Sequence, residues 1–103
     1  MPILLEFFPS PLRNKRYRMI FQDHRIIDFG MKQSNTYVDG ATDRTRKNYL
    51  SRHSKNEVWS KINPGSASAF ILWGESRDIG DNLIQYLDRF QIKISKGAKI
   101  VLA

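Results

Sequence analysis

The segment that decides the fold class is DRTRKNYLSRHSKNEVW, residues 43–59. An oxygen of Thr42 or Asp43 caps the start of a helix here, because either side chain can accept hydrogen bonds from the free amides of the first turn. We expect that helix to end near Ser54. Its apolar side has only three members, Tyr49, Leu50 and His53. Because helix propensity alone would not keep this segment helical in water, the helix must pack on the rest of the protein through Tyr49 and Leu50.

The sequence before Gly40 has a different period. Residues 15–21 (KRYRMIF) alternate polar and apolar side chains, as half-buried strands do. After the turn-like residues 22–24, residues 25–30 (RIIDFG) return as a second strand. Gly30 ends that strand in a conformation that branched residues resist. The change from period two to helical spacing after Gly40 predicts a β-hairpin followed by helices.

Two more helices are expected after the first. A short helix runs from Ala67 to Trp73, capped by Ser66 and closed by Gly74 in the left-handed conformation. A longer helix over residues 77–90 has an apolar stripe at helical spacing, Ile79, Leu83, Leu87 and Phe90. The chain is therefore predicted to be a small single α+β domain, with an N-terminal β-hairpin packed on about three α-helices and with extended terminal arms.

The two ends are predicted to lie outside the domain core, with residues 1–12 as an N-terminal arm, 13–91 as the domain and 92–103 as an extended tail. The N-terminal arm is apolar, but it lacks the basic start of a signal peptide and is too short to span a membrane, so no transmembrane segment is expected. The tail is expected to form two short strands, residues 92–94 and 99–102. The candidates for contact with neighbouring proteins in an assembly are Leu4, Leu5, Phe7, Phe8, Ile100 and Leu102. The central fragment is then expected to fold alone but to fail in assembly.

The net charge of +7 is concentrated in one half of the chain. Residues 13–61 hold twelve Lys and Arg against five Asp and Glu, a net +7, whereas residues 62–103 carry a net +1. A basic half attracts polyanions, namely nucleic acid, anionic lipid headgroups or an acidic protein surface, and it also keeps a small protein soluble. On a strand, Arg16 and Arg18 share one face. The candidate contacts with a polyanion or partner are Arg13, Lys15, Arg16, Arg18, Arg44, Lys47 and Lys55.

The sequence contains no recognisable active site. Without cysteine, and with two histidines far apart in the chain, neither a thiolate site nor a zinc site is expected. His53 and Glu57 can meet at a helix end, but no nucleophile signature accompanies them, so a structural role near the helix C-terminus is favoured. We therefore predict no enzymatic activity, no catalytic residue, no cofactor and no metal. Trp59 and Trp73 are expected to be core residues.

A dispersed set of residues carries a family resemblance. These residues are Phe29-Gly30, Asp43 through Tyr49, Arg52-His53, Glu57, Trp59, Pro64-Gly65, Ser68, Leu72-Trp73, Tyr86 and Arg89-Phe90. The pattern resembles a family of short, uncharacterised proteins encoded by large double-stranded DNA viruses of eukaryotes, among them viruses of algae and amoebae. Ala69 departs from it, since a basic residue is expected there in relatives. The first and last 12 or so residues fall outside the resemblance. The resemblance implies a viral setting and no particular reaction.

Two function classes follow from these observations. The first is a structural virion protein, a minor capsid component that cements or links larger capsid proteins through its terminal arms. It would reside in the virion, and in the host cytoplasm or nucleus during assembly. The alternative is a basic viral protein that associates with nucleic acid by binding the phosphate backbone without sequence specificity. The expected partners are thus other viral structural proteins, with nucleic acid as the second class.

Overall fold

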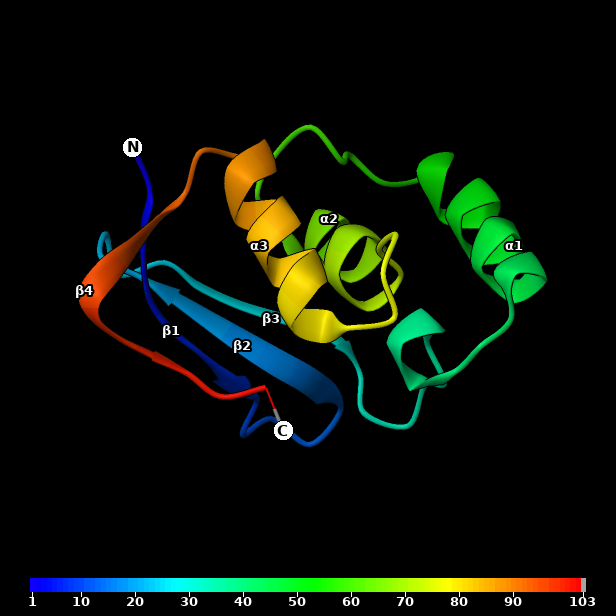
Figure 1. Cartoon of the computed structure of the whole chain (residues 1–103), viewed down its shortest axis with the longest axis horizontal. Helices are drawn as coiled ribbons and strands as arrows, with labels where there is room; N and C mark the ends of the chain where they lie inside the picture. Colours follow the sequence, from blue (N-terminus) through cyan, green and yellow to red (C-terminus); the bar gives the residue numbers. More distant parts are fainter. Residues whose placement is uncertain (103) are drawn as a thin grey trace.

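A four-stranded mixed sheet forms one layer of the protein (Figure 1). The computed structural model describes residues 1–102 of the chain. The strands lie in the order β3-β2-β1-β4; β1, β2 and β3 form an antiparallel meander, and β4 runs parallel to β1. Their bounds are β1 (Ile3–Pro9), β2 (Lys15–Phe21), β3 (Ile26–Met31) and β4 (Lys93–Ile100). The predicted α+β class and the predicted hairpin, which is β2 and β3, are confirmed.

Helices form the second layer, and their bounds are η1 (Tyr37–Asp39), α1 (Asp43–Ser54), α2 (Pro64–Ala67), η2 (Ser68–Leu72) and α3 (Ile79–Arg89). The segment η2 is a π-helical turn, in which the Trp73 amide donates to the Ser68 carbonyl at 3.0 Å. Figure 1 shows α2 and α3 over one face of the sheet, with α1 at the opposite end of the molecule from β4. The sheet and the helices α2, η2 and α3 enclose the core, whereas α1 has no buried residue.

The two chain ends are strands of the sheet, not arms beside it. β1 lies between β2 and β4, and Leu4 and Phe7 are fully buried. The Val101 amide donates to the Phe7 carbonyl at 2.7 Å, which ties the C-terminal end to β1. The division into an arm, a domain of residues 13–91 and a tail is therefore corrected. The physical reason is that the β2–β3 hairpin alone leaves the outer edge of β2 unpaired, so β1 pairs with that edge and β4 pairs in turn with β1.

The remaining arm candidates are less buried than Leu4 and Phe7. Leu5, Phe8 and Leu102 are half-buried, and Ile100 is 37% exposed. The tail forms one strand, where two had been expected. Its pairing with β1 shifts at a bulge, because Ile94 lies opposite Leu4 while Lys99 lies opposite Glu6. β4 is an edge strand of the sheet, and its lysines and irregular pairing are features by which proteins discourage the addition of another strand.

The helix boundaries follow the capping residues. The Thr42 hydroxyl accepts from the Thr45 amide at 3.1 Å, which confirms the predicted start of α1. The short helix begins earlier than predicted, because Asn63 is its cap and accepts from the Ser66 amide at 2.8 Å. The Ser66 hydroxyl is buried instead and lies 2.7 Å from the Tyr86 hydroxyl.

Close packing leaves no room for a side chain at Gly30 or at Gly74. Gly30 has φ +77°, and a Cβ there would lie 2.5 Å from a Leu72 methyl carbon, so a side chain is excluded twice. Gly74 does not have the expected left-handed backbone. It is needed because a Cβ would lie 2.3 Å from the Phe70 carbonyl oxygen and 2.6 Å from the Asn82 side chain.

Candidate functional site

The inner face of α1 attaches this helix to the domain. The Tyr49 ring stacks on Trp73 with centroids 4.3 Å apart and an angle of 9° between the planes. The Arg46 Nε donates to the carbonyl oxygens of Trp73 and Gly74, both at 3.0 Å. Leu50 is partly buried against the core. The predicted attachment through Tyr49 and Leu50 is confirmed, and Arg46 adds hydrogen bonds that its charge did not predict.

His53 continues the aromatic stack toward solvent. Its ring lies on Tyr49 with centroids 3.9 Å apart, so Trp73, Tyr49 and His53 form one column. His53 Nδ1 lies 2.7 Å from Glu57 Oε2, and Trp59 Nε1 donates to Glu57 Oε1 at 2.9 Å. The predicted meeting of His53 and Glu57 is confirmed. Because a carboxylate only accepts, it holds Nδ1 as the donor and leaves Nε2 directed elsewhere.

This column borders a cleft of about 430 Å³ between β3, α1 and the start of α2. We call it the His53 cleft. Its lining residues are Lys15, Gly30, Met31, Ser34, Thr36, Tyr49, Arg52, His53, Glu57, Pro64, Gly65, Ser68, Leu72 and Trp73. Most of them belong to the dispersed pattern given above, although they are spread over the chain from Gly30 to Trp73. The fold therefore brings this part of the pattern together in one site.

The electrostatics of the His53 cleft are uneven. Burial, with the nearby charge of Glu57, raises the pKa of Tyr49 to about 12, so its hydroxyl stays protonated near neutral pH. Both Glu57 oxygens are already occupied by His53 and Trp59. A Cβ on Gly65 would lie 3.1 Å from Glu57 Oε1, so this glycine lets the carboxylate approach the backbone. Lys15 and Arg52, by contrast, are exposed cations at the cleft.

Two of the predicted polyanion contacts are used inside the protein. Arg16 forms a two-bond ion pair with Asp39 and lowers the pKa of that carboxyl to about 2. Arg18 Nε donates to Asp28 Oδ1 at 2.9 Å, and this bond lowers the Asp28 pKa. Both arginines are half-buried. We therefore correct the expectation that Arg16 and Arg18 offer free charge, because each one is neutralised by a carboxylate close by.

The other predicted contacts are exposed. Arg44, Lys47 and Lys55 lie on one side of α1 and its end, together with Asn48 and Ser51. We call these five residues the outer face of α1. Within residues 1–102, no acidic side chain forms an ion pair with any of its cations. Arg13 and Lys15 are exposed near the start of β2 and lie away from this face.

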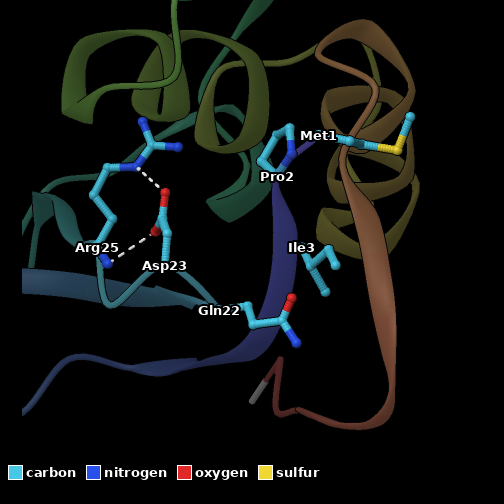
Figure 2. A pocket seen from close by; sticks show the side chains of 6 residues that line it. All are labelled: Met1, Pro2, Ile3, Gln22, Asp23 and Arg25. Carbon is cyan, nitrogen blue, oxygen red and sulfur yellow. Dashed lines mark hydrogen bonds and ion pairs between the residues drawn. The ribbon is translucent and has the colours of Figure 1, made fainter.

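A second hollow, of about 410 Å³, lies at the other end of the sheet (Figure 2). It is lined by Met1, Pro2, Ile3, Gln22, Asp23 and Arg25. Figure 2 shows that its two charged side chains face each other, and Arg25 Nε lies 3.6 Å from Asp23 Oδ2. These two side-chain charges compensate one another across a surface turn, whereas Lys15 and Arg52 at the His53 cleft form no ion pair among residues 1–102.

The two tryptophans differ in burial. Trp73 is 5% exposed, which confirms it as a core residue, whereas Trp59 is half-buried and meets the Phe70 ring edge-on at 5.6 Å. Trp59 lies outside the core cluster, which corrects the expectation for this residue: its ring is half-buried and its Nε1 is used in the hydrogen bond to Glu57. The spacing of Tyr49, His53 and Glu57, four residues apart each time, was the sequence signal for the site. Trp73, Ser68 and Lys15 also line the cleft, but no spacing pattern near them in the sequence indicates this.

Comparison with known proteins places one part of the chain. No curated protein and no solved structure was found to match it. Among residues 1–102, no helix has the length and apolar character that a membrane crossing requires. A family match covers residues 5–53, which includes residues 5–9 of β1 although the resemblance above left the first 12 residues out. Over residues 5–53 the chain is thus similar to a family of unknown function, DUF5754.

Proposed function

We propose that the outer face of α1 binds the phosphate backbone of nucleic acid without sequence specificity. The observation that carries this proposal is the arrangement of Arg44, Lys47 and Lys55 on one exposed helix face without a paired acid among the described residues. Exposed, unpaired cations attract phosphates and release the counterions condensed on them. Asn48 and Ser51 between them supply further hydrogen-bond donors for phosphate oxygens.

The attachment of α1 supports the same proposal. Its inner face is held by the Tyr49–Trp73 stack and by the Arg46 hydrogen bonds, so the outer face is presented on a fixed helix. Among the described residues, the three cations of the outer face form no ion pair and remain available to phosphates. Sequence specificity would need side chains positioned against base edges, and lysine and arginine at this spacing provide charge without such a code.

The test compares two triple variants that remove the same charge. One carries Arg44→Gln, Lys47→Gln and Lys55→Gln; the control carries Lys93→Gln, Lys96→Gln and Lys99→Gln on β4, whose lysines are exposed as well. Affinity for a labelled duplex is measured by anisotropy over a series of salt concentrations. We expect the α1 variant to reduce the slope of log K against log salt by about 3 and the control to change it little. Equal losses in both variants would mean that net charge, and not α1, attracts the nucleic acid.

We propose, on the family resemblance alone, that the protein belongs to a large double-stranded DNA virus of eukaryotes. Its place would then be the virion, or the host cytoplasm or nucleus during assembly. The cementing role among capsid proteins stays a prediction. The argument for a cementing role was that the two ends are free arms, but both ends are strands of the sheet. The remaining support for this role is the exposure of apolar side chains such as Ile100 and Val101. Mass spectrometry of purified particles, separated into shell and genome fractions, tests this setting.

A further inference from the structure

We infer that the His53 cleft is a nucleotide-binding site, in which a base stacks on the His53 ring and the phosphate pairs with Lys15 and Arg52. The site goes beyond backbone binding by the outer face of α1, with which it shares no residue. Its ligand class is a nucleoside phosphate, either free or as the terminal nucleotide of a strand. Three features of the cleft carry this inference.

The first feature is a stacking platform. Trp73 is buried and anchors the column, Tyr49 lies on it, and His53 forms the open end with 36% of its side chain exposed. Three rings in contact restrict one another, so the outermost ring is held in place before a ligand arrives. A flat base extends such a column, and histidine is among the side chains on which bases stack.

The second feature is the orientation of the His53 ring. Glu57 holds Nδ1, and Trp59 in turn holds the other oxygen of Glu57, so the His53 ring cannot rotate without breaking its hydrogen bond to a carboxylate that is itself held in place. In the described part of the chain, Nε2 has no hydrogen-bond partner. It is therefore available to a polar group of the ligand, as a donor when the ring is protonated and as an acceptor when it is neutral.

The third feature is charge placement and size. Lys15 comes from the start of β2 and Arg52 from α1, so the two cations reach the cleft from separate elements. Among the described residues, the carboxylate in the lining, Glu57, forms no ion pair with either cation, because its oxygens bond to His53 and Trp59. A volume of about 430 Å³ lies within the range of small-ligand sites. Two free cations beside an aromatic ring match the two halves of a nucleotide.

The test uses adenosine monophosphate, adenosine and inorganic phosphate as separate probes on the full-length protein. Binding is followed by NMR through the His53 imidazole signals and the indole signals of Trp59 and Trp73. We expect the nucleotide to shift all three sets and to bind more tightly than either fragment. Arg52→Gln removes an exposed charge without disturbing the core and should weaken nucleotide binding on the order of tenfold. His53→Ala should weaken both the nucleotide and adenosine.

The control variant is Lys96→Gln on β4, which removes an equal exposed charge outside both the cleft and the outer face of α1 and should leave nucleotide binding unchanged. A 5′-phosphorylated dinucleotide separates the two ligand sources, because tighter binding than the mononucleotide indicates a strand end and equal binding indicates a free nucleotide. Shifts with phosphate but none with adenosine would overturn the stacking site. Equal weakening by Arg52→Gln and Lys96→Gln would overturn the location. Loss of duplex binding in the α1 triple variant with intact nucleotide binding separates this inference from the proposed function.

Discussion

The sheet and α1 differ in what they bury. β1 and β2 each contribute fully buried residues, among them Phe7, Met19 and Phe21, whereas α1 has none. The sheet is held by apolar area removed from water, which is the dominant favourable term in folding. α1 is held by one aromatic stack and two arginine hydrogen bonds to backbone carbonyls. The difference teaches that apolar burial lies between the sheet and the helices that cover it, while the outer-face cations and the His53 cleft lie at α1.

The largest effect is expected from removing the end strands. A fragment of residues 13–91 lacks β1 and β4, and with them Leu4 and Phe7. We expect it to remain unfolded, with no cooperative transition in circular dichroism. In the full chain, Phe7→Ala should lower the free energy of unfolding by about 3–5 kcal/mol, because it leaves a cavity beside Tyr17 and Phe29. A fragment that folds would return the ends to the role of arms and remove the contrast.

The next effect separates the two tryptophans. Trp73→Ala should cost about 3–5 kcal/mol, since its ring is buried and supports Tyr49. Trp59→Ala should cost only about 1–2 kcal/mol, because the ring is half-buried and its loss removes chiefly one hydrogen bond and an edge contact. Urea unfolding of both variants measures the difference. Equal costs would show that the region around Glu57 is as tightly packed as the core.

A third variant tests how α1 is attached. Arg46→Met removes the hydrogen bonds to the Trp73 and Gly74 carbonyls and should weaken the docking of α1 by about 1.5–3 kcal/mol. Arg44→Met on the outer face is the matched control and should change stability by no more than about 0.5 kcal/mol. Amide hydrogen exchange measures this, and only α1 amides should exchange faster in Arg46→Met. Faster exchange throughout the sheet would mean that the two regions unfold together.

The smallest expected effect is the acid response of Asp39. Its pKa is lowered from 3.8 to about 2, chiefly by the bond to Arg16. A depressed pKa stabilises the fold above the ordinary value, and this stabilisation is lost as the pH falls through about 2. Because the carboxyl is partly exposed to solvent, we expect a contribution of only about 1 kcal/mol. Wild type and Asp39→Asn should therefore differ in stability at pH 5 and converge near pH 2. A difference that stays constant from pH 5 to pH 2 would assign the effect to contacts that do not depend on the charge of the carboxylate.

The candidate site was predictable in part from spacing along the helix. Tyr49, His53 and Glu57 recur every four residues, and that spacing predicted the contact between His53 and Glu57. Trp73 and Lys15 belong to distant elements, so their place beside His53 follows only from how α1 packs. The free charge of Arg16 and Arg18 could not be judged from sequence either. Their partners Asp39 and Asp28 lie 23 and 10 residues away along the chain.

The sequence by itself determined the local elements: the hairpin from its alternation, the start of α1 from its cap, and α3 from its apolar stripe, because these depend on residues close together in the chain. Tertiary structure alone decided the fate of the two ends. Their apolar side chains indicate only that the two ends pack against something. The same sequence pattern is expected for an arm that packs on another protein and for a strand of the protein's own sheet. Pairing between β1 and β4 joins residues about 90 apart, and no local pattern records such a contact.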